Sequence, residues 1–412
     1  MCKKGNYEFI EGGVCASQGF LASGMYAGFK KNKSKLDLAL IYSETMCNCA
    51  GVYTLNKVQG APIVVTKKHL EGNNKAQAVI INSGNANTCN LDGEEKALKM
   101  CELTGEALNI KTQDVLVAST GIIGQVLPIE PVENNITTLK EKLSTSGNIE
   151  ASKAILTTDL VTKECAVEFK LGDKTCRVGG MSKGSGMIHP NMATMLAFVT
   201  TDVNISKEVL QEALIDVTND TFNMISVDGD TSTNDTVIVM SNSKSDNKEI
   251  SDKNSDEYKI FYKALYLVLE DLSKAIAQDG EGATKLLECN VLNASSKNIA
   301  KVVAKSVITS SLFKSAMFGR DPNWGRILCA IGYAEAEFNI NKIQVEIKSE
   351  VGSIIVCKDG RGVDFDVEFA VKILEAHDVF INIDMNDGKA SAKAWGCDLT
   401  YDYVKINADY HT

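Results

Sequence analysis

A glycine-rich loop that runs directly into an apolar strand constrains this chain more than any other stretch. Residues 179–202 read GGMSKGSGMIHPNMATMLAFVTTD. Glycines among small and polar residues, with Pro190 close behind them, favour an irregular and closely packed loop. The apolar run Met195–Val199 then predicts a buried strand. The junction falls at Thr194, so a hydroxyl side chain is expected where a loop enters a rigid element.

The hydroxyl of Thr194 is a candidate nucleophile. A threonine hydroxyl is normally a poor nucleophile, but a threonine at a chain terminus can use its own α-amine as the base. That amine has a pKa of about 7.7–8.0, so a useful fraction of it is neutral near pH 7. Thr194 is internal in the encoded chain. Cleavage between Ala193 and Thr194 would create the missing amine.

The residues around this junction resemble a known family. The segment at residues 183–196, KGSGMIHPNMATML, is similar to the self-cleavage segment of the ornithine acetyltransferase (glutamate N-acetyltransferase, ArgJ-type) family. In that family the threonine after Met-Ala attacks the preceding carbonyl group, the chain splits in two, and the new terminal threonine accepts the acyl group. The resemblance runs from Gly12 to Thr412 and implies that Thr194 is this threonine.

A second motif, DVLVASTGIIG at residues 114–124, predicts a strand that ends in Ser-Thr-Gly. A hydroxyl beside a glycine amide at a strand end suits an oxyanion hole, because two fixed donors can meet the charge that builds on a carbonyl oxygen during acyl transfer. Taken alone, the pattern also fits an ordinary turn. The resemblance implies that the donors are the Thr120 hydroxyl and the Gly121 amide.

The resemblance also implies a set of substrate contacts. Lys183 would bind the α-carboxylate of an amino acid as a point charge, and Glu281 would lie at the amino end of the substrate. Taken alone, these two residues fit a solvated lysine and a surface carboxylate after a helix. The chain terminus is expected to fold into the site. The implied contacts are one of Thr157 and Thr158, then Lys183, Thr194, Glu281, Asn407 and Thr412.

Composition and charge narrow the class of partner. The 412 residues suffice for two or three domains or one large α/β unit. The net charge is -10, and no stripe of lysine and arginine interleaved with aromatic residues indicates nucleic-acid binding. The sequence has neither a signal-peptide core nor an apolar run of about eighteen residues for a membrane span. A cytoplasmic protein with no membrane partner is expected.

Metal sites and disulfides have weak support. The run VDGDTSTND contains Asp228, Asp230 and Asp235, but an EF-hand loop that starts at Asp228 would have glycine at its sixth and glutamate at its twelfth position, where the chain has Thr233 and Val239. The histidines are too few and too scattered for a zinc cluster. The 12 cysteines are spread along the chain and are expected to be reduced, mostly buried thiols. The sequence thus predicts no metal and no cofactor, with acetyl-CoA left open as an alternative acetyl donor.

The rhythm of strands and helices predicts an α/β, layered fold, which the resemblance narrows to a self-cleaving N-terminal-nucleophile acetyltransferase of the ornithine acetyltransferase/DmpA-like type. The polar stretch 241–257 is predicted to be a disordered loop. Arg320 and Asp321 are expected to pair near the site. Helices are predicted over residues 93–108, 132–143, 206–222, 258–278, 297–318 and 367–376.

The resemblance implies an enzyme of arginine biosynthesis that moves an acetyl group from N-acetylornithine to glutamate through acetyl-Thr194, by a ping-pong route. Its fragments, 1–193 and 194–412, would be the α and β chains of an α2β2 heterotetramer. An additional acetyl-CoA-dependent amino-acid N-acetyltransferase activity stays open. Two alternatives also stay open: an N-terminal-nucleophile amidohydrolase or aminopeptidase that passes the acyl group to water, and a non-catalytic small-molecule binding protein.

Overall fold

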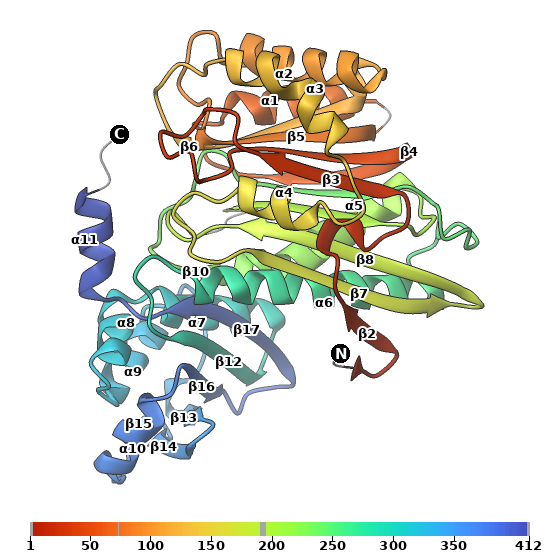
Figure 1. The fold of residues 1–412 in the computed structure, drawn as a ribbon. Coiled ribbons are helices and arrows are strands. Elements are labelled where there is room, and N and C mark those ends of the chain that lie inside the picture. The colour runs from red at the N-terminus through yellow and green to blue at the C-terminus, as the bar shows by residue number, and fades with distance from the viewer. Residues whose placement is uncertain (1–2, 73, 190–194, 410–412) are drawn as a thin grey trace.

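Two β-sheets with helices packed on their faces make up the fold (Figure 1). The structure, a computed structural model, describes residues 3–72, 74–189 and 195–409. The α/β, layered fold predicted from the sequence is confirmed. Within these residues no helix is both long and apolar enough to cross a membrane.

The larger sheet collects strands from both halves of the chain. In the described residues it has 10 strands in the order β1-β2-β7-β8-β9-β11-β4-β5-β6, with β3 paired to β4. β9 is parallel to β11 and antiparallel to β8, and β11 is antiparallel to β4. The strands are β1 (Lys3–Lys4), β2 (Tyr7–Ile10), β3 (Phe20–Met25), β4 (Leu38–Tyr53), β5 (Lys75–Asn85), β6 (Val115–Ile122), β7 (Lys163–Leu171), β8 (Lys174–Lys183), β9 (Leu196–Thr201) and β11 (Thr236–Ser241).

The smaller sheet is built from the later part of the chain. Among the described residues it has 7 strands in the order β10-β17-β12-β16-β13-β14-β15. The strands are β10 (Ile225–Ser226), β12 (Leu286–Ala294), β13 (Gln344–Ser349), β14 (Gly352–Lys358), β15 (Arg361–Gly362), β16 (Asp378–Asp384) and β17 (Ala390–Cys397).

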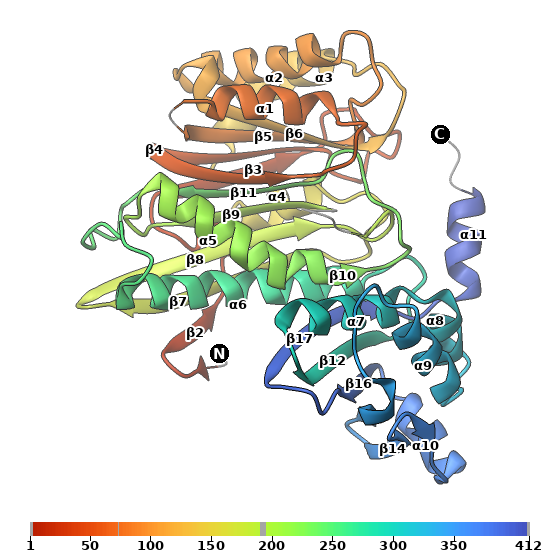
Figure 2. The same cartoon turned by 180° about the vertical axis from the view of Figure 1, so that it is seen from behind.

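Helices cover both sheets and join them. In Figures 1 and 2 the helices α1 to α3 lie at one end of the larger sheet, and α6 lies between the two sheets. The helices are α1 (Ala61–Leu70), α2 (Gly93–Leu108), α3 (Glu130–Glu141), α4 (Asn148–Ala154), α5 (Lys207–Asp220), α6 (Asp256–Gln278), α7 (Lys297–Thr309), α8 (Ser311–Phe318), α9 (Trp324–Gly332), α10 (Val367–Leu374) and α11 (Tyr401–Asp409), with 3-10 turns η1 (Gly13–Cys15), η2 (Thr112–Asp114), η3 (Phe222–Met224) and η4 (Ile340–Lys342).

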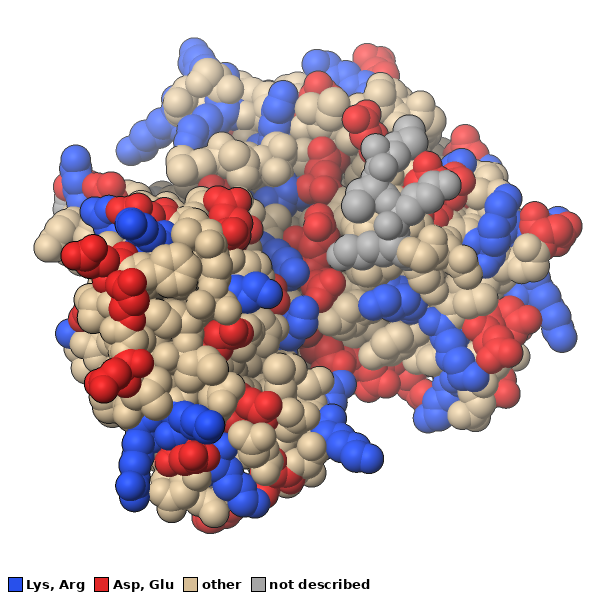
Figure 3. All heavy atoms as spheres, turned by 90° about the horizontal axis from the view of Figure 1, so that it is seen from below, with Lys and Arg blue, Asp and Glu red and all other residues tan. Residues whose placement is uncertain are grey.

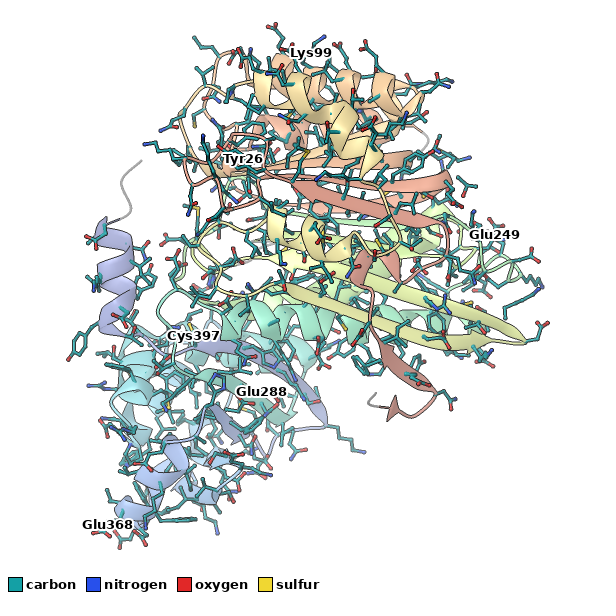
Figure 4. All side chains as sticks on the ribbon, in the orientation of Figure 1. Tyr26, Lys99, Glu249, Glu288, Glu368 and Cys397 are labelled. Carbon is teal, nitrogen blue, oxygen red and sulfur yellow. The ribbon has the colours of Figure 1, made fainter. Side chains whose placement is uncertain are left out.

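An ionic group around the buried carboxylate of Glu288 ties α6 to the smaller sheet. Glu288 on β12, labelled in Figure 4, accepts a hydrogen bond from Nε1 of Trp395 on β17 at 2.8 Å. Lys274 on α6 lies 3.2 Å from the same carboxylate. Because each polar atom is paired, the group can be buried at low cost.

Acidic and basic side chains are interspersed on the face that Figure 3 shows.

The buried strand predicted after the glycine loop is β9. All of its residues from Leu196 to Thr201 are buried. Leu196 and Phe198 pack into one core cluster, and Ala197 and Val199 pack into the cluster that contains α6. A strand covered on both faces reads as a continuous apolar run, which is the pattern that the sequence shows here.

The stretch 241–257 begins at the last residue of β11, continues as an ordered loop and ends in the first turn of α6, so the prediction of a disordered loop is wrong. The Asn247 side chain accepts a hydrogen bond from the Asn204 amide at 2.7 Å and donates one to the Asn204 carbonyl at 3.1 Å. Ile250 is 2% exposed and forms a β-bridge with Ile205. Asparagine side chains thus make hydrogen bonds with backbone groups that have no neighbouring strand. Composition alone does not predict these bonds.

The single helix predicted over 297–318 is two helices. The chain leaves the helical conformation at Ser310, where φ is -67° and ψ is 111°. The Ser310 hydroxyl accepts a hydrogen bond from the Phe313 amide and caps α8. A serine can stand inside a helix or at the start of one. Here its hydroxyl caps α8, so the chain forms two helices instead of one.

Candidate active site

The inner strands of the larger sheet end around a cavity of about 170 Å3. β9 begins there at Leu196, between the end of β8 at Lys183 and the start of β11 at Thr236. Met195 lines the cavity. Predicted site residues from five separate segments line it too: Thr120, Gly121, Thr157, Thr158, Lys183, Glu281 and Asn407. The other predicted residues, Ala193, Thr194 and Thr412, lie outside the described part of the chain.

The proposed oxyanion donors lie where β6 runs close to β5. Gly121 has a φ of +134°, and a side chain there would collide with the backbone of Gly84. Only glycine fits this position, because the close approach and the positive φ both exclude a Cβ atom. The Asn234 side chain donates hydrogen bonds to the carbonyls of Ala86 at 2.6 Å and Ser119 at 3.0 Å. These bonds hold the two strand ends together beside Thr120.

Lys183 is a buried lysine in the cavity wall. Its ammonium group donates a hydrogen bond to Thr157 at 2.8 Å and lies 3.5 Å from the hydroxyl of Thr120. Burial lowers the pKa of Lys183, and the carboxylate of Asp159 works against that shift. Thr157 therefore contacts the lysine directly, and Thr158 lines the cavity beside it. The sequence left the choice between these two threonines open.

A buried ionic cluster fixes the backbone that carries Lys183. Lys163 lies 2.8 Å from Asp159 and 2.5 Å from Asp279. Asp159 also accepts hydrogen bonds from the amides of Gly184 at 2.7 Å and Thr157 at 3.0 Å. Burial disfavours the charged form of Asp159, but the ammonium groups of Lys183 and Lys163 outweigh it and hold the pKa well below its usual range.

Glu281 and Asn407 meet at the mouth of the cavity. The Asn407 amide donates a hydrogen bond to the Glu281 carboxylate at 2.8 Å. The Glu281 backbone amide donates to the Ser185 carbonyl at 3.0 Å. A side chain at Gly186 would collide with the Glu281 carboxylate. The glycine loop therefore leaves room for this carboxylate, and Asn407 reaches it from α11, the helix at the C-terminal end of the chain in Figure 1.

Asp228, considered above as a calcium ligand, binds the backbone of the glycine loop. Its carboxylate accepts hydrogen bonds from the amides of Met187 at 2.6 Å and Ile188 at 2.9 Å. Met187 has a φ of +55°, which is uncommon for a residue with a side chain. Sequence reasoning missed this role, although an aspartate before a glycine is a known turn signal.

The expected pair of Arg320 and Asp321 does not form. Arg320 lies 3.3 Å from Glu375 instead, and Asp321 accepts a hydrogen bond from the side chain of Asn323 at 2.9 Å. Neither residue lines the cavity. Adjacent residues at a helix end point in different directions, so their proximity in sequence does not make them partners.

Comparison with known proteins assigns the chain to a family. The ArgJ family model matches residues 21–412. The chain is 48% identical to arginine biosynthesis bifunctional protein ArgJ of Caldanaerobacter subterraneus subsp. tengcongensis, over 98% of this chain and 100% of the relative. It is 51% identical to ArgJ 1 of Clostridium acetobutylicum, over 95% of this chain and 96% of that one. A crystal structure of the ArgJ protein of Bacillus halodurans, 49% identical, matches with a TM-score of 0.50 over 53% of this chain and 100% of the solved chain. The chain therefore belongs to the ArgJ family.

Proposed function

We propose that this protein is an acyltransferase of arginine biosynthesis that moves an acetyl group from N-acetylornithine to glutamate. The observation that carries the proposal is the cavity that Lys183 and Glu281 line together with Thr120 and Gly121. A buried ammonium and a carboxylate match the opposite charges of an amino acid, and the neighbouring hydroxyl and amide match a carbonyl oxygen. The names of the ArgJ relatives, which refer to arginine biosynthesis, support this substrate class.

The proposed nucleophile is Thr194, which directly precedes the cavity residue Met195. Its hydroxyl first attacks the Ala193 carbonyl, and hydrolysis of the resulting ester separates the fragments 1–193 and 194–412. The freed α-amine then takes the hydroxyl proton as Thr194 attacks the acetyl group of N-acetylornithine. Thr120 and Gly121 stabilise the oxyanion, while Thr157, Lys183, Glu281, Asn407 and Thr412 orient the amino acid.

The length of the solved relative supports the cleavage step. The Bacillus halodurans chain is fully covered, yet it spans only 53% of this chain. The full-length sequences of the ArgJ relatives, by contrast, match nearly all of this chain. A fragment that begins at Thr194 makes up about 53% of the 412 residues. A chain of that length is the product that cleavage before Thr194 predicts, and we propose that the two fragments assemble as an α2β2 heterotetramer.

Cleavage is tested on the purified protein. We expect two bands, and N-terminal sequencing of the second should start at Thr194. Thr194→Ala should give an intact, folded and inactive chain, because one hydroxyl serves both cleavage and transfer. Thr175→Ala, in the hairpin of β7 and β8, is the matched control and should be cleaved. A single intact band from active protein would contradict the proposal.

Acetyl transfer is tested by ornithine release. With N-acetylornithine alone, we expect one ornithine per site and an acetyl mass increment on the second fragment, then no further turnover until glutamate is added. Steady release without glutamate would identify the hydrolase alternative. Release of CoA from acetyl-CoA in the presence of glutamate would add the second acetyl donor.

A further inference from the structure

The side chain of Asn234 lies in the cavity wall, where three segments of the chain meet. It is 5% exposed. Its nitrogen donates hydrogen bonds to the carbonyls of Ala86 at 2.6 Å and Ser119 at 3.0 Å. Its oxygen accepts hydrogen bonds from the hydroxyls of Thr88 and Thr233, each at 2.6 Å. One side chain thus joins the loop after β5, strand β6 and the segment before β11.

These four hydrogen bonds use the full capacity of the amide group, which has two N–H donors and an oxygen with two lone pairs. The two backbone carbonyls can only accept, so the nitrogen must face them and the orientation of the amide is fixed. A Cβ atom at Gly60 would lie 2.6 Å from this nitrogen, so the amide is closely packed on that side as well. Asn234 has no N–H group or lone pair left for a substrate. Any effect on the reaction must pass through the groups that it holds.

The hydrogen bond to Ser119 acts on the proposed oxyanion hole through the backbone. The carbonyl of Ser119 and the amide of Thr120 belong to one planar peptide unit, so a hydrogen bond to this carbonyl fixes the orientation of the plane. The ladder between β5 and β6 is irregular at Asn85, opposite Thr120. The next residue, Gly121, has the backbone freedom of a glycine. Asn234 therefore supplies a constraint at the point where the regular pairing of the strands ends.

We propose that Asn234 is a positioning residue that aligns the oxyanion donors, Thr120 and Gly121, with the carbonyl under attack; the inference rests on the proposed function. Donors stabilise an oxyanion best when they already point to its position, because no energy is then spent on turning them during the reaction. A negatively charged oxygen forms on the acetyl carbonyl when Thr194 is acetylated, and again when the acceptor amine takes the acetyl group. Asn234 therefore acts equally on both half-reactions.

Asn234→Asp tests this alignment. The substitution keeps the size of the side chain and the oxygen that faces the two hydroxyls, but it removes the two N–H donors to the backbone carbonyls. A displacement of about 1 Å costs about 100-fold in rate, so we expect the rate constants of acetylation and of transfer to glutamate to fall together by about 10–100-fold. Quenched-flow measurement of ornithine release gives the first rate constant. Mixing of the acetylated enzyme with glutamate gives the second.

Binding of ornithine separates alignment of the donors from a general loosening of the site. Ornithine has the charged groups of the amino acid but no acetyl carbonyl, so it does not use the oxyanion donors. Its Kd for Asn234→Asp, measured by isothermal titration calorimetry, should stay within about threefold of the parent.

The matched control is Asn242→Asp. Asn242 is also 5% exposed, and its side chain donates hydrogen bonds to the Gln18 carbonyl at 2.8 Å and to the Ser43 hydroxyl at 3.3 Å. It follows the end of β11 opposite to the cavity. Both rate constants and the Kd of ornithine should match those of the parent.

Thr88→Val is a second variant, used if Asn234→Asp does not fold or is not cleaved. It keeps the shape of the side chain and removes one of the two hydroxyls that hold the Asn234 oxygen. The loss of one hydrogen bond should lower both rate constants by about 3–10-fold. The Kd of ornithine should again stay at the value of the parent.

Three results would overturn the positioning role. These are rate constants equal to those of the parent, a loss confined to one half-reaction, and a Kd of ornithine that rises in proportion to the loss of rate, as a merely structural role predicts. A parent protein that N-acetylornithine does not acetylate would instead overturn the proposed function, and this inference with it.

Discussion

Lys183 contacts two other predicted site residues at once, Thr120 and Thr157. Its ammonium group connects the threonine proposed for the oxyanion hole with the threonine proposed for substrate binding. Because the group is buried and its pKa is lowered by that burial, little solvent screens its charge. A carboxylate bound there would meet a strong local field.

Lys183→Met tests this charge. Hydrogen bonds to charged groups contribute about 1.5–3 kcal/mol, so we expect kcat/KM for N-acetylornithine to fall about 10–100-fold, mainly through KM. Steady-state kinetics measure it. Lys170→Met, on the exposed part of β7, is the control and should leave both constants unchanged. A change in kcat alone would mean that Lys183 acts on the transition state and not as an anchor.

Individual site residues could be predicted only where a motif carries them. Thr120, Gly121, Lys183 and Glu281 stand in recognisable segments, and the structure brings all of them to one cavity. Asp235 stands in the acidic run that does not match a calcium loop, and no motif marks it as a cavity residue. Its burial and its place in the cavity wall follow from the pairing of β11 with β9, which no local pattern predicts.

At the scale of elements, Lys163 is the tie between the loop 157–160, strand β7 and the end of α6. It binds Asp159 and Asp279, and both carboxylates in turn accept backbone hydrogen bonds. Removing one partner of a buried ion pair leaves an uncompensated charge, which is far more costly than removing the whole pair.

Lys163→Met should lower the free energy of unfolding by about 3–5 kcal/mol. Urea unfolding of Lys163→Met and of Lys170→Met, an exposed lysine on the same strand, measures the difference. The control should stay within about 0.5 kcal/mol of the parent. Equal stabilities of the two variants would show that Asp159 and Asp279 are satisfied without the lysine.

Elements with a clear amphipathic period were predicted closely, and elements shaped by side-chain capping were not. Helix α2 has the predicted bounds, and α6 begins two residues before the prediction. The break at Ser310 depends on the hydrogen bond that its hydroxyl accepts from the Phe313 amide, and the packed loop after β11 depends on the hydrogen bonds of the Asn247 side chain. Such side-chain hydrogen bonds offer the backbone an alternative to a continuous helix or a disordered loop. Composition alone does not predict which conformation forms.

At the scale of the whole molecule, the larger sheet does not follow the proposed fragment boundary. β9 and β11, which come after residue 194, lie between β8 and β4, which come before it. Pairings of this kind join distant segments, so local patterns could not predict the strand order. The division into 1–193 and 194–412 remains a prediction about covalent structure.

The strand order predicts that the two fragments stay together after cleavage. Separation would break the ladders between β8 and β9 and between β11 and β4, and would expose both core clusters beside them. We expect both fragments to elute in one peak in size-exclusion chromatography under native conditions and to separate only in denaturant. Separate native peaks would contradict the interleaved sheet.

The same interleaving has a kinetic consequence. While the chain is intact, β9 meets β8 by closing a short loop, a first-order event whose rate does not depend on protein concentration. In the proposed cleaved form the two strands belong to separate molecules, so their reunion after denaturation is second-order. Dilution should therefore slow refolding of the cleaved protein and leave that of the Thr194→Ala chain unchanged. Cleavage thus turns a molecule that can refold alone into one whose recovery depends on finding its other half.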